Sequence, residues 1–196
     1  YNFIDTKLMK ENKNIENTEK IKIITVGGLV EVKGYDRLIK IATYLLENKN
    51  IKWEWNIYGE GAQREELSIL IKENKLENYV KLRGVTKNIY DKYKESDLYV
   101  LTSYSEGLPM ALLEAKASGL PIISFDIETG PSEIVRDGID GYLIKDNELE
   151  LMAQEILTLI ENEELRKKFS KNSRGNLEKF EKTKIINQWK NLIDTL

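Results

Sequence analysis

The chain has 196 residues and a net charge of −3. This length suffices for one sizeable α/β domain with its own core and is short for two. A charge so close to neutral, without a Lys/Arg stripe, argues against a nucleic-acid partner. The sequence contains neither cysteine nor histidine, which excludes disulfides, thiol catalysis, the commonest general base and the commonest metal ligand.

No segment of the sequence predicts a membrane span or a secretion signal. No apolar run approaches the roughly 20 residues that a membrane-spanning helix needs. No signal-peptide pattern opens the chain. We therefore expect a cytoplasmic protein.

From residue 21 onward, predicted strands and helices alternate. Residues 1–20 are polar, lack sustained periodicity and predict a linker or an arm. Short apolar runs then predict strands at 23–26, 53–58, 80–82, 98–101, 121–125 and 142–144. Helical spacing predicts helices at 38–45, 67–71, 89–93, 109–118 and 132–136, with two or three more in 148–196.

Such alternation predicts an α/β domain with a parallel sheet that helices cover on both faces. Ligands of these sheets bind at the carboxyl ends of the strands, where the strand order switches. The loops that matter for function should therefore follow Val26, Tyr58, Leu82, Leu101 and Phe125.

The strongest local signal is S-E-G-L-P-M-A-L-L-E at residues 105–114. A strand ends there, a glycine turn follows, and a helix begins with Pro109 at its start and Gly119 at its end. The helix is apolar nearly all round, which predicts burial. Its free amides form an anion site suited to a diphosphate.

Two glutamates belong to this segment. Glu114 lies within the predicted buried helix, where a carboxylate needs a hydrogen-bonding partner. The residues alone leave two candidates open, the ribose diol of a nucleotide or a neighbouring Lys or Arg in the core. Glu106 lies in the loop before the helix, from which it could reach a sugar hydroxyl.

The second signal is V-G-G-L-V-E-V-K-G-Y-D at residues 26–36. Gly27 and Gly28 would let a ligand approach the backbone closely. Lys33 could offer a point charge to phosphate, although taken alone it also fits a solvated surface lysine. The spacing matches neither a dinucleotide-binding fingerprint nor a Walker loop.

Three weaker features also follow predicted strands. Y-G-E-G at 58–61 and G-V-T at 84–86 fit either ligand-facing loops, the second for a nucleobase, or plain turns. G-P-S-E at 130–133 fits either a helix start near a ligand or a simple cap. The sequence has no D-x-D pair, so it predicts no metal–diphosphate site of that kind.

Taken together, these segments resemble glycosyltransferase family 4, the group 1 retaining enzymes with the GT-B fold, over the whole chain. Glu106 and Glu114 look like that family's E-x7-E motif, and residues 26–36 look like its first phosphate loop. Y-G-E-G, the turn at Gly84 and G-P-S-E-I-V-R-D-G-I-D-G-Y-L-I occur in the family's order and spacing. Five segments in register favour the ligand-binding interpretations over the structural ones.

The resemblance implies the C-terminal, nucleotide-sugar-binding half of a GT-B enzyme. Such a half has a doubly wound, Rossmann-like sheet, here six-stranded and parallel, with C-terminal helices. Residues 1–20 would form the interdomain linker and 21–180 the nucleotide-sugar-binding domain. Residues 181–196 would form a helix that packs toward an N-terminal domain absent from this sequence.

The resemblance also implies a role for individual residues. Lys33 would contact the diphosphate, Glu114 the ribose hydroxyls and Glu106 the donor sugar, with Lys33 and Glu106 serving catalysis. The family usually has Arg at the position of Gly28, as a second phosphate cation. The donor-binding residues implied in this way are Gly27, Gly28, Lys33, Gly59, Val85, Glu106, Gly107, Leu108, Pro109 and Glu114.

The implied function is retaining transfer, without metal or other cofactor, of a hexose or N-acetylhexosamine from a UDP-sugar. The acceptor would be a glycan or lipid-linked sugar in bacterial surface polysaccharide assembly, such as capsule or lipopolysaccharide, bound through the absent N-terminal domain. The isolated chain should then be inactive, and the full-length protein could lie at the inner face of the cell membrane. Alternatives are a UDP-sugar 2-epimerase of GT-B architecture and a non-catalytic nucleotide-sugar-binding module; the missing fingerprint disfavours an NAD-dependent dehydrogenase.

Overall fold

The computed structural model describes residue 4 and residues 20–47 and 51–194. Its centre is one six-stranded sheet in the order β3-β2-β1-β4-β5-β6, with every neighbouring pair parallel. The strands are β1 (Ile21–Val26), β2 (Trp53–Tyr58), β3 (Val80–Gly84), β4 (Leu98–Leu101), β5 (Ile122–Asp126) and β6 (Gly141–Lys145). This is the strand order of the doubly wound, Rossmann-like α/β fold, as predicted.

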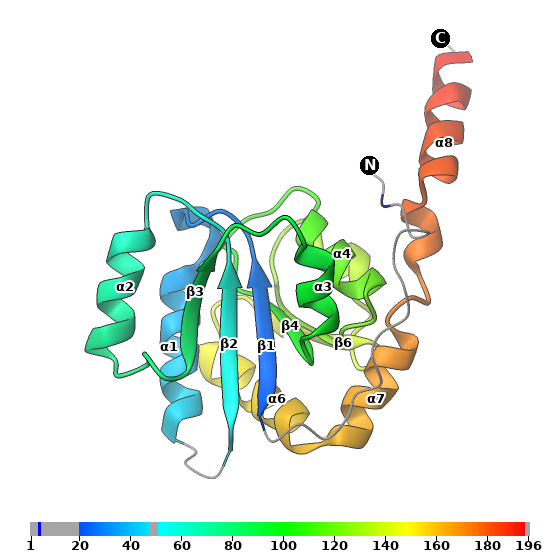
Figure 1. Ribbon diagram of the computed structural model, residues 1–196. Coiled ribbons are helices and arrows are strands. Elements are labelled where there is room, and N and C mark those ends of the chain that lie inside the picture. Colours follow the sequence, from blue (N-terminus) through cyan, green and yellow to red (C-terminus); the bar gives the residue numbers. More distant parts are fainter. Residues whose placement is uncertain (1–3, 5–19, 48–50, 195–196) are drawn as a thin grey trace.

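Helices cover both faces of the sheet (Figure 1). One core contains residues of α1 (Tyr35–Glu47), α2 (Arg64–Glu73), α6 (Leu149–Glu161) and α7 (Glu163–Asn172). The other contains residues of α3 (Ile89–Lys94), α4 (Met110–Ala117) and α5 (Pro131–Ile134), and of the short 3-10 helix η3 (Leu177–Phe180). Ile23 and Ile24 of β1 lie in different cores because successive side chains of a strand point to opposite faces.

The switch in strand order lies between β1 and β4, which are neighbours in the sheet. After β1 the chain passes through a 3-10 turn, η2 (Glu31–Lys33), to α1, and after β4 it passes to α4. Because α1 and α4 cover opposite faces, the chain turns to different sides of the sheet after these strands, and the general rule for such sheets places the ligand crevice at their carboxyl ends. The fold therefore selects the loops after Val26 and Leu101 among those named from the sequence.

Each predicted strand and helix within the described residues is present, with small shifts at the ends. The helix predicted from Pro109 begins at Met110 because Pro109 is extended (φ −71°, ψ 93°). The helix predicted at 132–136 spans Pro131–Ile134 because Val135 is extended. Gly119 adopts the left-handed conformation (φ 84°) expected after a helix end.

Complete burial of the helix at 110–117 was a wrong prediction. Met110, Ala111 and Glu114 are partly exposed, whereas the charged Lys116 is wholly buried. The helix therefore places Glu114 on the side that faces away from the sheet core.

Ile4, near the start of the chain, meets the segment just before the final helix. Of the predicted linker 1–20, only Ile4 and Lys20 lie within the described residues, and Ile4 is buried and forms a parallel bridge with Glu181. The final helix, α8 (Lys182–Asp194), extends beyond the rest of the domain (Figure 1). Its packing toward a further domain stays a prediction. None of the described helices combines the length and apolar character that crossing a membrane requires.

Candidate functional site

The two residues predicted to serve catalysis touch each other across the switch point. The Nζ atom of Lys33 lies 2.8 Å from Oε1 and 3.0 Å from Oε2 of Glu106. The Lys33 side chain is 28% exposed and the Glu106 side chain 9% exposed. The hydroxyl of Ser103 also donates to Glu106, at 2.6 Å. Lys33 is therefore held by both carboxylate oxygens of Glu106 at the switch point, with part of its side chain exposed, and its contact with phosphate stays a prediction.

Main-chain contacts hold the loops that carry this pair. The N–H of Tyr104 donates to the carbonyl of Val32, and the hydroxyl of Thr102 donates to the carbonyl of Lys33. Gly34 has a φ of 64°, and a Cβ there would lie 2.2 Å from the Thr102 carbonyl oxygen. Only glycine fits this close approach. Gly34 therefore lets the backbone at Lys33 lie directly against Thr102, which follows β4.

The glycines predicted to bind the donor differ in what the fold requires of them. A Cβ at Gly59 would lie 1.9 Å from the carbonyl oxygen of Gly27, so packing between the loops after β1 and β2 explains Gly59. The Gly27 carbonyl also accepts a hydrogen bond from the Tyr35 hydroxyl. Gly28 is exposed, has no positive φ, and a Cβ there would meet only the Glu60 carbonyl, at 3.8 Å. Packing thus does not require glycine at position 28.

The start of α4 faces the same crevice. Of the donor-binding residues Gly107, Leu108 and Pro109 that the resemblance implies, Pro109 cannot donate a main-chain hydrogen bond, because proline has no N–H. The candidate donors are the amides of Gly107, Leu108, Met110 and Ala111, because the N–H groups of Leu112 and Leu113 already donate to the Pro109 carbonyl. Gly130 packs behind this turn, since a Cβ there would lie 2.6 Å from Pro109. The G-P-S-E segment therefore supports the helix start.

Glu114 lies one helical turn into α4 and is half-buried. Its Oε2 accepts a hydrogen bond from the hydroxyl of Tyr93, at 3.1 Å. Burial raises the pKa of Glu114 and the Tyr93 hydrogen bond partly offsets that rise. The interpretation in which a core Lys or Arg pairs with Glu114 is therefore wrong. Val85, at the end of β3, is 76% exposed and free to meet a ligand.

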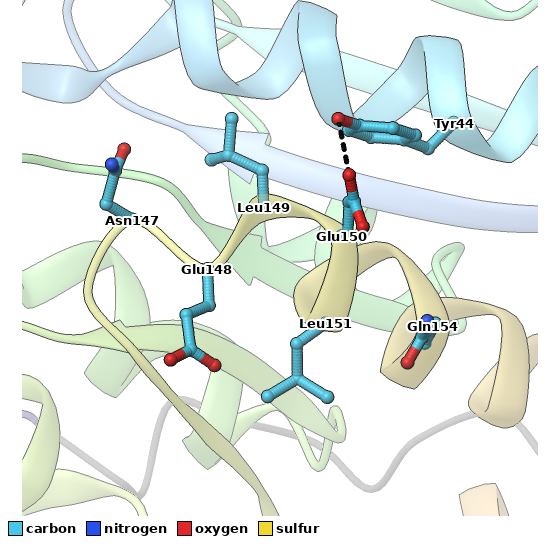
Figure 2. A pocket seen from close by; sticks show the side chains of 7 residues that line it. All are labelled: Tyr44, Asn147, Glu148, Leu149, Glu150, Leu151 and Gln154. Carbon is cyan, nitrogen blue, oxygen red and sulfur yellow. Dashed lines mark hydrogen bonds between the residues drawn. The ribbon is translucent and has the colours of Figure 1, made fainter.

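Two surface hollows have linings whose chemistry does not suit a nucleotide, and the second adjoins the loop that carries Lys33. One, between α1 and the start of α6, is lined by Tyr44, Leu149, Leu151, two glutamates, an asparagine and a glutamine; the Tyr44 hydroxyl donates to Glu150 (Figure 2). The other is lined by Glu31, Asp36, Glu66 and three uncharged residues. Both linings contain carboxylates and no Lys or Arg, so they would repel a diphosphate.

Two side-chain pairs gave no signal in the sequence, Tyr93 with Glu114 and Lys116 with Asp140. Tyr93 gave no motif signal, and its partner lies 21 positions away. Lys116 lay inside an apolar helix, where its pairing with Asp140 at 2.6 Å could not be read from spacing. Neither pairing has a local sequence signature. In the part of the chain that the structure describes, no three His, Cys, Asp or Glu side chains gather to hold a metal ion.

Comparison with known proteins identifies the family. Residues 7–176 match the glycosyl transferases group 1. The chain belongs to this family.

Two curated relatives and one solved structure illustrate the similarity. A poly(ribitol-phosphate) alpha-N-acetylglucosaminyltransferase of Staphylococcus aureus is 34% identical over 91% of this chain and 36% of its own length. The amylovoran biosynthesis glycosyltransferase AmsD of Erwinia amylovora is 34% identical over 88% of this chain and 48% of its own. A crystal structure of S. aureus TarM with Fondaparinux, alpha-GlcNAc-glycerol and UDP superposes with a TM-score of 0.88 at 30% identity, covering 97% of this chain and 38% of that one.

The match extends over nearly all of this chain but only part of its relatives. The chain spans between about a third and a half of the length of these proteins. The shared region is a Rossmann-like domain of the GT-B glycosyltransferase fold, which confirms the predicted fold class.

Proposed function

We propose that the protein containing this chain is a retaining glycosyltransferase that uses a UDP-sugar. It transfers a hexose or N-acetylhexosamine to a glycan or lipid-linked acceptor in bacterial surface polysaccharide assembly, and this chain is the domain that binds the donor. The observation that carries the proposal is the contact of Lys33 with Glu106 at the carboxyl ends of β1 and β4, together with the half-buried Glu114 one turn into the helix that follows. One cation, one sugar-facing carboxylate and one ribose-facing carboxylate are what a nucleotide sugar needs for recognition.

Relatives support the choice of donor and stereochemistry. The TarM crystal contains UDP together with alpha-GlcNAc-glycerol, and a relative from Bacillus subtilis is named poly(glycerol-phosphate) alpha-glucosyltransferase. A common UDP-hexose carries its sugar in α linkage, so an α-linked product keeps the configuration at the anomeric carbon. This supports retention for the present protein.

The geometry suggests how the chain would assist transfer. Charge builds on the diphosphate as the bond to the anomeric carbon breaks, and Lys33 with the first-turn amides of α4 would stabilise that charge. Glu106 would orient the donor sugar while holding the Lys33 ammonium group in place. The departing phosphate oxygen would take the proton from the acceptor hydroxyl, which fits the absence of histidine from this chain. No metal is needed in this scheme.

A thermal-shift experiment tests the proposal. UDP and UDP-sugars should raise the melting temperature of this chain, because a ligand of the native state stabilises it. The shift should be equal with and without EDTA. A strict requirement for Mn²⁺ or Mg²⁺ would contradict metal-independent binding.

Turnover assays separate the proposal from its alternatives. The full-length protein should make a glycoside with retained configuration, and this chain alone should bind donor without transferring sugar. Release of a 2-epimer of the UDP-sugar would instead support the epimerase, and binding without turnover by the full-length protein would support a non-catalytic module.

A further inference from the structure

Two tyrosines lie side by side beneath the crevice, Tyr93 of α3 and Tyr99 of β4. Both are wholly buried, and their ring centroids lie 6.3 Å apart. Their hydroxyls have different surroundings. The Tyr93 hydroxyl lies 3.1 Å from Oε2 of Glu114 and 3.3 Å from the carbonyl oxygen of Ala111. The buried Tyr99 hydroxyl makes no hydrogen bond to Glu114 among the described residues, and the main-chain N–H of Val26 lies near its oxygen.

The Tyr93 contact constrains Glu114 in a specific way. A half-buried glutamate on a helix has several rotamers, and a hydrogen bond to one carboxylate oxygen favours one of them. Because Tyr93 engages Oε2, the other oxygen, Oε1, is left for a second donor. Tyr93 belongs to α3, which follows the exposed Val85 turn, and Glu114 belongs to α4. The hydrogen bond between them therefore links these two helices.

We propose that Tyr93 is a positioning residue that orients Glu114 toward the ribose diol and thereby sets the preference of the site for ribonucleoside diphosphates. This inference rests on the proposed function, since it requires that Glu114 meet the ribose.

A phenol suits this task better than a charged group. A lysine or arginine would offer Glu114 several charge-assisted hydrogen bonds, which would compete with a diol for the carboxylate oxygens. Burial raises the pKa of Tyr93 well above its ordinary value, so the hydroxyl stays a neutral donor. Tyr93 therefore orients the carboxylate through Oε2 and leaves Oε1 for the diol.

Tyr93→Phe tests the proposal, with Tyr99→Phe as the matched control. Each change removes one buried hydroxyl from one of two neighbouring rings, but only the first removes a hydrogen bond to Glu114. Glu114→Gln reports separately on the ribose contact. For each variant, calorimetry would measure the affinity of this chain for UDP and for 2′,3′-dideoxy-UDP, which lacks the diol.

The parent chain should prefer UDP over the dideoxy analogue, and Glu114→Gln should remove most of that preference. Tyr93→Phe should lower the affinity ratio at least about threefold, mainly by weakening UDP binding. Tyr99→Phe should keep the parent's ratio.

Three outcomes would overturn the inference. Tyr93→Phe could keep the parent's ratio while Glu114→Gln loses it; the ribose contact would then stand without Tyr93. Tyr93→Phe could weaken both ligands equally, or Tyr99→Phe could lower the ratio as much, which would indicate a general packing role. A parent chain that binds both ligands alike, with no change in Glu114→Gln, would instead refute the ribose role of Glu114 within the proposed function.

Discussion

The chain contains two lysine–carboxylate pairs of nearly equal length in very different settings. Lys33 and Glu106 meet at 2.8 Å at the mouth of the crevice, where both keep some exposure. Lys116 and Asp140 meet at 2.6 Å with neither side chain exposed. The first pair joins two loops at the carboxyl ends of strands, whereas the second joins α4 to the turn before β6.

The two pairs differ most in how many donors bind the carboxylate and in how far the lysine is exposed. Asp140 accepts from Lys116 and also from the main-chain N–H and Nε of Arg136, so three donors compensate its burial. Glu106 accepts side-chain hydrogen bonds from Lys33 and Ser103, and Lys33 remains partly exposed to an incoming anion. The buried Lys116–Asp140 pair, here called the closed pair, therefore contributes to stability. The partly exposed Lys33–Glu106 pair, the open pair, leaves its lysine available to bind an anion.

Breaking the closed pair should have the largest effect. Lys116→Met removes the ammonium group and leaves Asp140 buried with Arg136 as its remaining charged partner. The free energy of unfolding should fall by about 3 kcal/mol, the scale for breaking a buried ion pair. Urea denaturation would measure it. UDP affinity should stay unchanged, and a large loss of UDP binding in the folded variant would contradict the separation of the two pairs.

The pH dependence of stability should also distinguish the closed pair. Burial lowers the pKa of Lys116 to about 8, whereas an unfolded lysine titrates near about 10.4. Between these values the unfolded chain binds more protons, so the contribution of Lys116 to stability rises with pH, at most by about 1.4 kcal/mol per unit. The buried Tyr93 and Tyr99 have raised pKa values and act oppositely, but only as pH approaches and exceeds 10.

Denaturation at pH 7.5, 8.5 and 9.5 would isolate this contribution. The parent chain should gain stability relative to Lys116→Met across the series. Parallel curves for the two proteins would mean that Lys116 keeps an ordinary pKa in the folded chain.

Breaking the open pair should affect binding more than folding. Lys33→Met keeps most of the apolar stem and removes the charge, so UDP affinity should fall at least about tenfold, or about 1.4 kcal/mol. The loss of stability should stay near 1 kcal/mol or below, because the pair is partly exposed. Titration calorimetry with UDP would measure affinity, and uridine, which lacks phosphate, should bind both proteins alike. Undiminished UDP binding would place the phosphate cation elsewhere.

The comparison also shows what the sequence could reveal. Glycines after strands and the E-x7-E spacing placed Lys33, Glu106 and Glu114 at one edge of the sheet, because parallel strands end together. The contact between Lys33 and Glu106 joins residues 73 positions apart, and only the strand order β1-β4 brings them together. Lys116 was hidden because an apolar periodicity indicates burial but does not reveal a buried charge. The sequence therefore predicted the type of each element, but it did not predict which side chains of different elements pair.

The smallest expected effect concerns Gly28, beside the open pair. The family resemblance implies arginine at this position. The structure leaves room for a side chain, since the nearest atom to a Cβ there would be the Glu60 carbonyl oxygen, at 3.8 Å. Gly28→Arg should therefore fold with stability within about 0.5 kcal/mol of the parent. In the Lys33→Met background it should recover part of the lost UDP affinity, by a few-fold and less than Lys33 supplies, because the arginine head is solvated and less constrained.

Gly28→Gln is the matched control, since it adds a long polar side chain without charge. It should not restore binding, and the gain from arginine should shrink at high salt. Gly59→Ala serves as the opposite case, because its Cβ would lie 1.9 Å from the Gly27 carbonyl oxygen and should destabilise the loops after β1 and β2. If Gly28→Arg leaves UDP affinity unchanged, a cation at position 28 does not reach the diphosphate. Lys33 would then be the side-chain cation on which phosphate binding by this domain depends. Gly34 positions its backbone against Thr102, and Glu106 holds its ammonium group.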